Sequence, residues 1–264
     1  MDGIADYRFV RPLSDGGHGT FFLARTPARL GLADPEVCVK VLPGADNADG
    51  LRRATRELRA FAAVSSPHLV TLLDAGQQDG AFYYAMEYCP LGSLAESAAL
   101  LERAAIVTAV AAAARGAHAL HEAGLVHRGI KPATILLHEG GARLADLGLV
   151  QALNPATSMT GLGAIGAVEF MEPGLLAGQQ ATAGSDVWSL GATLHRALTG
   201  TGIYGELPER DPLLCVRTVL TRRPALAASL SEADAALVAR CLADDEQDRP
   251  PTALAVAEEL ESSI

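Results

Sequence analysis

The first residues that could do chemistry form a glycine-rich turn followed by a lysine. Gly16 and Gly19 separate two apolar runs, and glycines in such a turn let backbone N–H groups approach phosphate oxygens, because no Cβ stands in the way. Lys40 ends the apolar run at 37–39. Its compact ammonium suits a phosphate, and burial of that charge would need an anionic partner, for which Glu57 is the candidate. These residues indicate a phosphate-binding site.

Lysine is scarce in this chain, which sharpens the interpretation of Lys40. The sequence contains 19 arginines and only two lysines, Lys40 and Lys131. Because ordinary positive charge is supplied by arginine, a lysine on a strand favours a specific role over an exposed edge position. Two alternatives stay open: a glycine hairpin that is only a turn, and a Lys40–Glu57 ion pair that only joins sheet to helix.

Three further blocks carry polar residues at fixed spacing. They are residues 125–137 (LVHRGIKPATILL), 144–148 (LADLG) and 185–191 (SDVWSLG). Together with the glycine-rich turn and the run that ends at Lys40, in this order and spacing, they resemble the signature set of protein kinases over about residues 7–262. The pattern is similar to that of bacterial Ser/Thr kinases of the eukaryotic type. Both lysines fall on the two lysine positions of that pattern.

The elements that must position these blocks follow from hydrophobic periodicity. Strands are predicted at 7–24 (a hairpin), 37–42, 69–73 and 81–88, with one helix at 50–64. A small hairpin is expected at 134–137 and 142–144, and a long loop at 148–170. Helices are predicted at 102–123, 185–199, 211–220, 231–242 and 251–262, the last four beginning near Ser185, Asp211, Ser231 and Thr252.

Strands first and helices afterwards predict an α+β fold with two lobes. We expect a single kinase-like domain over residues 1–264. Its small β-rich N-lobe with one helix would span about 7–89, and its larger helical C-lobe about 92–262.

The resemblance assigns roles by position. It implies that the chain binds ATP or ADP with Mg²⁺, and that Met86 is the gatekeeper beside the adenine-binding hinge. The implied nucleotide-binding residues are Gly16, Gly19, Lys40, Glu57, Glu87, Cys89, Leu136 and Asp146. Asp146 would hold the metal. Asp186, Trp188 and Arg249 would be structural.

The chain departs from the family pattern where catalysis is carried out. The aspartate that accepts the substrate proton is replaced by Gly129, and the asparagine that binds a second Mg²⁺ is replaced by Thr134, although Lys131 is retained. The bracing threonine of the activation segment appears as Ala167, and the glutamate of its Ala-Pro-Glu motif appears as Gly174.

This loss leaves Arg249 without its usual carboxylate, and nearby Glu172 is the candidate replacement. Because the losses occur together, they indicate a pseudokinase with no intact catalytic set.

Three substitutions count against nucleotide binding, while the retained lysine, glutamate and aspartate count for it. Ser14 replaces the first loop glycine, Phe21 replaces the small valine over adenine, and Cys38 replaces the small alanine beside the lysine. The two enlarged side chains would point into the adenine slot, where Phe21 could mimic the base.

Hydroxyls in the predicted 148–170 loop are candidate regulatory sites. Thr157, Ser158 and Thr160, with Thr182 further on, match the region where an active kinase phosphorylates members of the family. The alternative is that each hydroxyl only makes the loop soluble.

These observations favour a pseudokinase that binds another protein as a regulatory or scaffolding module. One alternative is a weakly active Ser/Thr kinase in which Glu169, Glu172 or a substrate carboxylate replaces the missing base. Another is a kinase-fold transferase that acts on a small molecule or transfers nucleotide.

Composition limits the partners. The net charge of −10 argues against general binding of nucleic acid or of an anionic membrane. Four cysteines without CxxC spacing indicate reduced thiols, and no signal pattern begins the chain. We expect a cytoplasmic protein, or the cytoplasmic domain of a larger one.

Overall fold

The computed structural model describes residues 2–15, 19–42, 48–146, 165–208 and 211–264. These residues form two compact units. The strand-rich unit contains residues 2–63 and 70–88, and the helical unit contains residues 64–69, 89–146 and 165–264. Each unit is described by itself.

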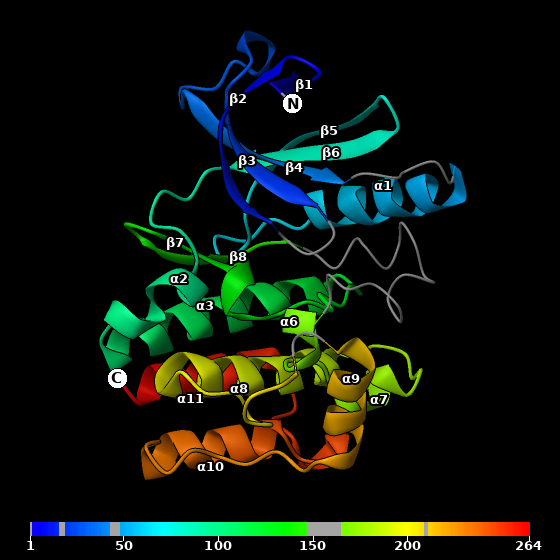
Figure 1. Ribbon diagram of the computed structural model, residues 1–264. Coiled ribbons are helices and arrows are strands. Elements are labelled where there is room, and N and C mark those ends of the chain that lie inside the picture. Colours follow the sequence, from blue (N-terminus) through cyan, green and yellow to red (C-terminus); the bar gives the residue numbers. More distant parts are fainter. Residues whose placement is uncertain (1, 16–18, 43–47, 147–164, 209–210) are drawn as a thin grey trace. The chain divides into compact units, whose positions relative to one another are not determined.

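The strand-rich unit is built on one antiparallel sheet of six strands (Figure 1). The strands are β1 (Gly3–Ile4), β2 (Tyr7–Asp15), β3 (Thr20–Arg25), β4 (Glu36–Leu42), β5 (Leu72–Gln78) and β6 (Ala81–Glu87), in the order β1-β2-β3-β4-β6-β5. The unit also holds the 3₁₀ turn η1 (Ala28–Leu30) and the helix α1 (Ala48–Ala62). Strand β4 is therefore interior, with β3 on one side and β6 on the other.

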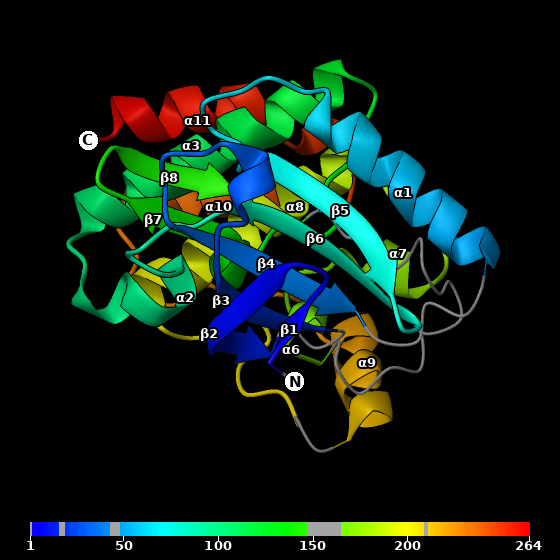
Figure 2. The same cartoon turned by 90° about the horizontal axis from the view of Figure 1, so that it is seen from above.

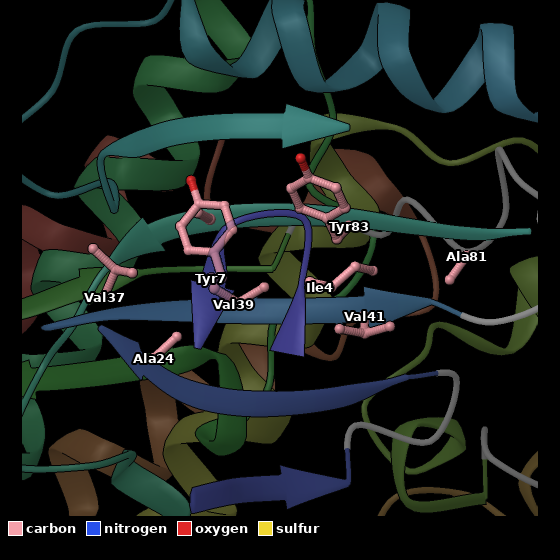
Figure 3. Packing of buried hydrophobic residues seen from close by; sticks show 9 residues of the cluster. Ile4, Tyr7, Ala24, Val37, Val39, Val41, Ala81 and Tyr83 are labelled. Atoms are coloured by element: carbon pink, nitrogen blue, oxygen red, sulfur yellow. The ribbon is translucent and has the colours of Figure 1, made fainter. Parts of the chain in front are cut away.

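The alternation of side chains along β4 divides the sheet into two faces. Val37, Val39 and Val41 belong to one apolar cluster, in which the rings of Tyr7 and Tyr83 meet edge to face at 5.8 Å (Figure 3). Residues 38 and 40 therefore project from the opposite face of the strand. Burial of the valine face fixes the register that aligns these two residues with β3 and β6.

The helical unit is arranged around α3 (Arg103–Glu122), which contacts α8 (Ala183–Thr199), α11 (Ala253–Ser262) and the strands β7 (Ile135–His138) and β8 (Gly141–Leu144) (Figure 2). Its other elements are α2 (Leu94–Ser97), η2 (Ala98–Leu100), η3 (Pro132–Thr134), α6 (Ile165–Val168), α7 (Pro173–Leu176), α9 (Pro212–Thr221), α10 (Glu232–Cys241) and η5 (Glu246–Asp248).

Small side chains let α3 pack closely against its neighbours. A Cβ on Gly116 would lie 2.7 Å from the carbonyl oxygen of His68, so only glycine fits at that contact.

The predicted helix starts are confirmed at three of four positions. The side chains of Asp211, Ser231 and Thr252 each accept a hydrogen bond from a backbone N–H of the first turn, as an N-cap does. The prediction for Ser185 is wrong, because α8 begins two residues earlier and Thr182 is its N-cap. Ser185 instead completes a capping box, since its Oγ accepts the hydrogen bond of the Thr182 N–H at 2.7 Å.

One predicted strand is misplaced. The apolar run 69–73 was expected to be a strand, but β5 begins at Leu72. Leu69 instead forms a parallel bridge with Leu144 of the helical unit, and both side chains are buried there. An apolar run does not reveal which sheet buries it.

The end of the predicted 148–170 loop is also different, because residues 165–168 form α6, while 148–164 lie outside the described residues.

Two expectations about the whole chain can be compared with the described residues. No helix in the described ranges is long and apolar enough to cross a membrane. All four cysteines are buried, and none of them forms a disulfide.

Candidate functional site

Of the two loop glycines assigned to phosphate, Gly16 lies outside the described residues and Gly19 lies at the start of β3. A Cβ on Gly19 would lie 2.5 Å from the carbonyl oxygen of Val41 and 2.8 Å from Cδ2 of Leu42. Glycine is therefore required here by the approach of β3 to the end of β4. This packing role does not depend on phosphate, and the phosphate role stays a prediction.

Lys40 is buried in the middle of the sheet. It lies on the interior strand β4 and is only 2% exposed, so the alternative of a solvent-exposed edge lysine is wrong. A buried ammonium is costly unless other groups compensate for lost hydration. One such group is the ring of Phe21, whose centroid lies 4.7 Å from Nζ of Lys40. Glu57 is half-buried on α1 in the same unit, and its ion pair with Lys40 stays a prediction.

The two enlarged side chains share a face with Lys40. Phe21 is directly opposite Lys40 in the pairing of β3 with β4, and Cys38 is two residues before Lys40 on the same strand. Cys38 is buried between its cross-strand neighbours Leu23 and Met86. Both enlarged side chains thus lie beside the lysine, a position that the sequence predicted only for Cys38. Whether they close an adenine slot stays a prediction.

The predicted hinge residues fall at the end of β6 and beyond it. The Glu87 N–H donates to the carbonyl oxygen of Thr71 at 3.0 Å, and the Thr71 N–H donates to Oε1 of Glu87 at 2.6 Å. Cys89 is buried, and Leu136 is half-buried on β7, where it forms a bridge with Ser93. Their contacts with adenine stay predictions.

The loop that carries Gly129 is held by a buried carboxylate. Asp186 on α8 is fully buried, and its Oδ1 accepts from the N–H of Arg128 at 2.9 Å. Its Oδ2 accepts from the N–H of His127 and from Nε2 of His121, both at 2.8 Å. Three donors around one buried carboxylate compensate for its desolvation. The structural role that the resemblance gives Asp186 is consistent with this geometry.

Gly129 occupies a position that has room for a side chain. The nearest atom to a Cβ built there is the carbonyl oxygen of Asp146 at 3.7 Å, an ordinary contact, and its φ is outside the left-handed region. Neither packing nor backbone conformation requires glycine at this position. The loop geometry therefore does not impose a glycine where the family pattern has an aspartate.

Thr134 is used inside the loop. Its hydroxyl accepts from the Lys131 N–H at 3.1 Å, and the carbonyl oxygens of Gly129 and Lys131 are both 3.0 Å away as acceptors. The side chain is 3% exposed. This hydroxyl thus closes the turn from residue 129 to residue 134. In the family pattern, this position carries the amide of an asparagine that would bind a metal ion.

The backbone is strained at two residues, Arg128 next to Gly129 and Asp146 after β8. Arg128 has φ 63° and Asp146 has φ 61°, in the left-handed region that costs a non-glycine residue about 1–3 kcal/mol. The loop that carries Gly129 and the segment after β8 are joined by two hydrogen bonds. The Ala145 N–H donates to the Thr134 oxygen (2.8 Å), and His127 Nε2 donates to the Ala145 oxygen (3.0 Å). Burial lowers the pKa of His127, which favours the neutral ring, and the contact with Ala145 requires the tautomer that carries its proton on Nε2.

Asp146 supplies one carboxylate for a metal ion. Mg²⁺ is commonly held by one or two carboxylates together with substrate phosphates, so Asp146 fits one ion in that manner. Among the described residues, no group of three histidine, cysteine or acidic side chains could hold a metal by itself. Binding of Mg²⁺ together with a nucleotide stays a prediction.

Arg249 pairs with the carboxylate of Glu172, two residues before the motif position at Gly174. Its Nη2 donates to Oε1 of Glu172 at 2.6 Å, and its Nη1 and Nε donate to the carbonyl oxygens of Gly184 and Ala243. Its guanidinium also lies 5.3 Å from the ring of Trp188. The suggestion that Glu172 serves Arg249 is confirmed, so the loss of a carboxylate at position 174 leaves this anchor in place.

Glu169 is the remaining acidic candidate for a substitute base. Its Oε1 is buried without a hydrogen bond from the described residues, and Nη1 of Arg196 lies 3.5 Å away. Burial raises the pKa of Glu169, against the opposing effect of Arg196. Glu172 is less suited to this role, because Arg249 occupies it.

Of the candidate regulatory hydroxyls, one lies within the described residues and three lie outside them. Thr157, Ser158 and Thr160 lie outside the described residues. Thr182 is described, and it caps α8: its Oγ1 accepts from the Ser185 N–H at 3.1 Å and donates to Glu246 at 3.1 Å. Its spacing of three residues before Ser185 is the capping-box signal that could have identified it from sequence.

Comparison with known proteins places this geometry in a family. The protein kinase domain family matches residues 7–260. The probable serine/threonine-protein kinase PkwA of Thermomonospora curvata is 35% identical over 203 residues, covering 75% of this chain and 26% of that protein. The serine/threonine-protein kinase PknJ of Mycobacterium tuberculosis is 32% identical over 268 residues, covering 93% of this chain and 43% of that protein. The chain thus spans less than half the length of these relatives.

A solved structure supports the same fold. The crystal structure of the Mycobacterium tuberculosis PknI kinase domain aligns with a TM-score of 0.75 at 23% identity, covering 99% of this chain and 98% of that one. The predicted α+β, two-lobed kinase-like fold is confirmed by this likeness. The family match and the curated relatives together show that the chain belongs to the protein kinase domain family and is related to bacterial Ser/Thr kinases.

Proposed function

We propose that this chain is a catalytically impaired pseudokinase that acts by binding another protein. The observation that carries the proposal is Gly129, which replaces the proton acceptor in a loop that has room for a side chain. A glycine can neither orient a substrate hydroxyl nor accept its proton. The same loop is still held by Asp186, so the fold keeps its framework without the catalytic group.

The use of Thr134 supports the same proposal. Phosphoryl transfer depends on metal ions and positioned charges more than on covalent chemistry by the protein. The Thr134 hydroxyl contacts the carbonyl oxygens of its own turn, where the family pattern has an amide for a second Mg²⁺. The loop thus lacks one metal ligand in addition to the base.

Nucleotide binding is the second part of the proposal. Lys40 would hold the phosphates of ATP or ADP, and Asp146 would hold Mg²⁺. When bound, ATP would supply a γ-phosphoryl group, which ADP lacks. Calorimetric titration with ATP, with and without Mg²⁺, tests this part. We expect saturable binding that is weakened at least tenfold by Lys40→Ala. The absence of heat at millimolar ATP would contradict nucleotide binding.

The partner is proposed to be a protein. The net charge of −10 gives no support for nucleic acid as a partner. Phosphorylation of Thr157, Ser158 or Thr160 by an active kinase would add negative charge and could regulate the interaction. The proposed location is the cytoplasm.

A transfer assay tests the loss of catalysis. With ATP labelled at the γ-phosphate, we expect no label on the protein or on a generic substrate. The double variant Gly129→Asp/Thr134→Asn should gain little, because Ala167 still lacks the bracing hydroxyl. Label that appears in the wild type and disappears in Asp146→Ala would show an active kinase. In a second assay with ATP labelled at the α-phosphate, label retained on the protein or substrate would show nucleotide transfer instead.

A weakly active Ser/Thr kinase is the second candidate, and Glu169 is the observation that favours it. Burial raises the pKa of this carboxyl, as a general base working near neutral pH requires. If Glu169 is the base, Glu169→Gln abolishes residual transfer and leaves ATP affinity unchanged. Equal transfer by wild type and Glu169→Gln would eliminate this role.

A further inference from the structure

Strand register brings the ring of Phe21 to the side chain of Lys40. Phe21 and Lys40 are direct partners in the antiparallel pairing of β3 with β4, and direct partners project from the same face of a sheet. The neighbouring residue Phe22 projects from the opposite face, where its ring stacks on Phe9 at 4.0 Å. The contact between residues 21 and 40 therefore follows from the sheet itself.

The geometry of the contact is that of a cation–π interaction. Nζ of Lys40 lies 4.7 Å from the centroid of the Phe21 ring, within the range of about 6 Å in which a ring face attracts an ammonium. Lys40 is only 2% exposed, and such contacts are strongest when the cation has lost its water. Phe21 itself is half-buried, so its ring contributes to the cover between the ammonium and solvent.

We propose that Phe21 sets the nucleotide affinity of this chain by acting as an intramolecular ligand of Lys40. A phosphate oxygen of a nucleoside di- or triphosphate that approaches the ammonium must replace the ring face. Binding therefore costs the chain the stabilisation that the ring provides. This inference rests on the proposed nucleotide binding and identifies the residue that controls it. A valine at this position, as in the family pattern, would remove the ring face from the ammonium.

The scarcity of lysine makes the contact directly observable. Because the chain has two lysines, labelling with lysine that carries ¹³C at Cε gives two ε-methylene NMR signals, which Lys131→Arg assigns. A ring face shields the protons above it, so the Lys40 signal should lie upfield in the wild type. Phe21→Leu, which keeps an apolar side chain without a π face, should remove that shift. Saturation with ATP should also reduce it.

Calorimetric ATP titrations then measure the consequence. Phe21→Leu and Phe21→Val should each bind ATP about threefold to thirtyfold more tightly than the wild type, the range expected from the strength of such a contact. Phe22→Leu is the matched control, since the same change on the other face should alter neither ATP affinity nor the Lys40 signal.

The outcomes separate this inference from the proposed function. Wild-type binding with unchanged or weaker binding by both Phe21 variants would overturn the role of Phe21 alone. Equal tightening by Phe22→Leu would also overturn it, by assigning the effect to a general loosening of the sheet. If neither the wild type nor any variant binds ATP, nucleotide binding and the role of Phe21 fail together. A wild-type Lys40 signal that is not shifted upfield, or that ATP leaves unchanged, overturns the inference without any variant.

Discussion

At the scale of single residues, two glycines differ in what they require of the fold. Gly19 lies where any Cβ would meet the backbone of Val41, so its identity is imposed by packing. Gly129 has no such constraint, and its neighbours leave ordinary contact distances for a side chain. The absence of an aspartate at position 129 is therefore not a structural necessity, which makes it informative about function.

The contrast predicts opposite effects of one substitution. Gly129→Ala should stabilise the protein by about 0.5 kcal/mol, because alanine restricts the unfolded chain at a position that it can occupy without strain. Gly19→Ala should destabilise it by about 2 kcal/mol, because the new methyl group overpacks the contact with β4. Urea unfolding of both variants against the wild type measures the difference. Equal effects of the two substitutions would refute the assignment.

The ion pair of Arg249 with Glu172 leads to a second residue-scale prediction. Glu172→Gln leaves a buried guanidinium without its carboxylate and should cost about 3 kcal/mol of stability. Adding Gly174→Glu to Glu172→Gln should recover part of this loss, because the atoms nearest to a Cβ at position 174 belong to the flexible side chain of Gln179. Urea unfolding of the single and double variants provides the measurement.

A matched control for Glu172 is the exposed pair of Arg115 with Glu261, in which both side chains are partly solvated. Glu261→Gln should cost less than about 1 kcal/mol, since exposed ion pairs contribute little. If Glu172→Gln costs no more than Glu261→Gln, the relocated carboxylate does not anchor the segment.

At the scale of elements, α8 connects the framework of the helical unit to the loop that carries Gly129. Its first turn supplies Asp186, whose carboxylate holds the backbone of His127 and Arg128. Thr182 is the N-cap of this helix, and its side chain satisfies a backbone N–H that would otherwise lack a partner. The position of the loop that carries Gly129 therefore depends on the first turn of α8.

Removal of the cap tests this dependence. Thr182→Ala should destabilise the protein by about 1 kcal/mol, the usual cost of losing an N-cap hydroxyl, whereas Thr182→Ser should be close to wild type. Thermal or urea unfolding distinguishes the two variants. A wild-type stability for Thr182→Ala would mean that the hydroxyl is not a cap, and would return Thr182 to the regulatory candidates.

At the scale of the whole molecule, folding lowers the pKa of several histidines. Burial is the main cause that lowers the pKa of His68, His127 and His195 below the ordinary value of 6.5. The His195 Nδ1 donates to the Thr201 carbonyl at 3.0 Å, while its Nε2 accepts from the Ala227 N–H at 3.0 Å. Protonation would remove the second contact, so the folded protein holds these protons less readily than the unfolded chain does.

Stability should therefore depend on pH in one direction. A pKa lowered by folding contributes stability that is complete above about pH 6.5 and is lost as the pH falls toward the folded value. Between pH 6.5 and 5.5 we expect a decline of up to about 1.4 kcal/mol per pH unit for each of the buried His127 and His195, and a smaller one for the more exposed His68. Urea unfolding at several pH values measures it. His195→Gln should show a shallower decline than the wild type, and parallel profiles would refute the contribution of His195.

The sequence by itself determined the order of the motif blocks, most element boundaries, the capping roles of Asp211, Ser231 and Thr252, and the absence of an aspartate at position 129. These features are local, because periodicity and capping involve residues within a few positions of one another.

Only the tertiary structure decided which distant groups meet. It paired Arg249 with Glu172, put Leu69 beside Leu144, and turned the ring of Phe21 toward Lys40. A sequence pattern tells which face of an element is buried, but the partner on that face depends on how elements far apart in the chain pack and in which register. For this reason the sequence was enough to identify Gly129 at the aspartate position of the family pattern, while the relocated carboxylate remained one candidate and the ring that contacts Lys40 was not foreseen.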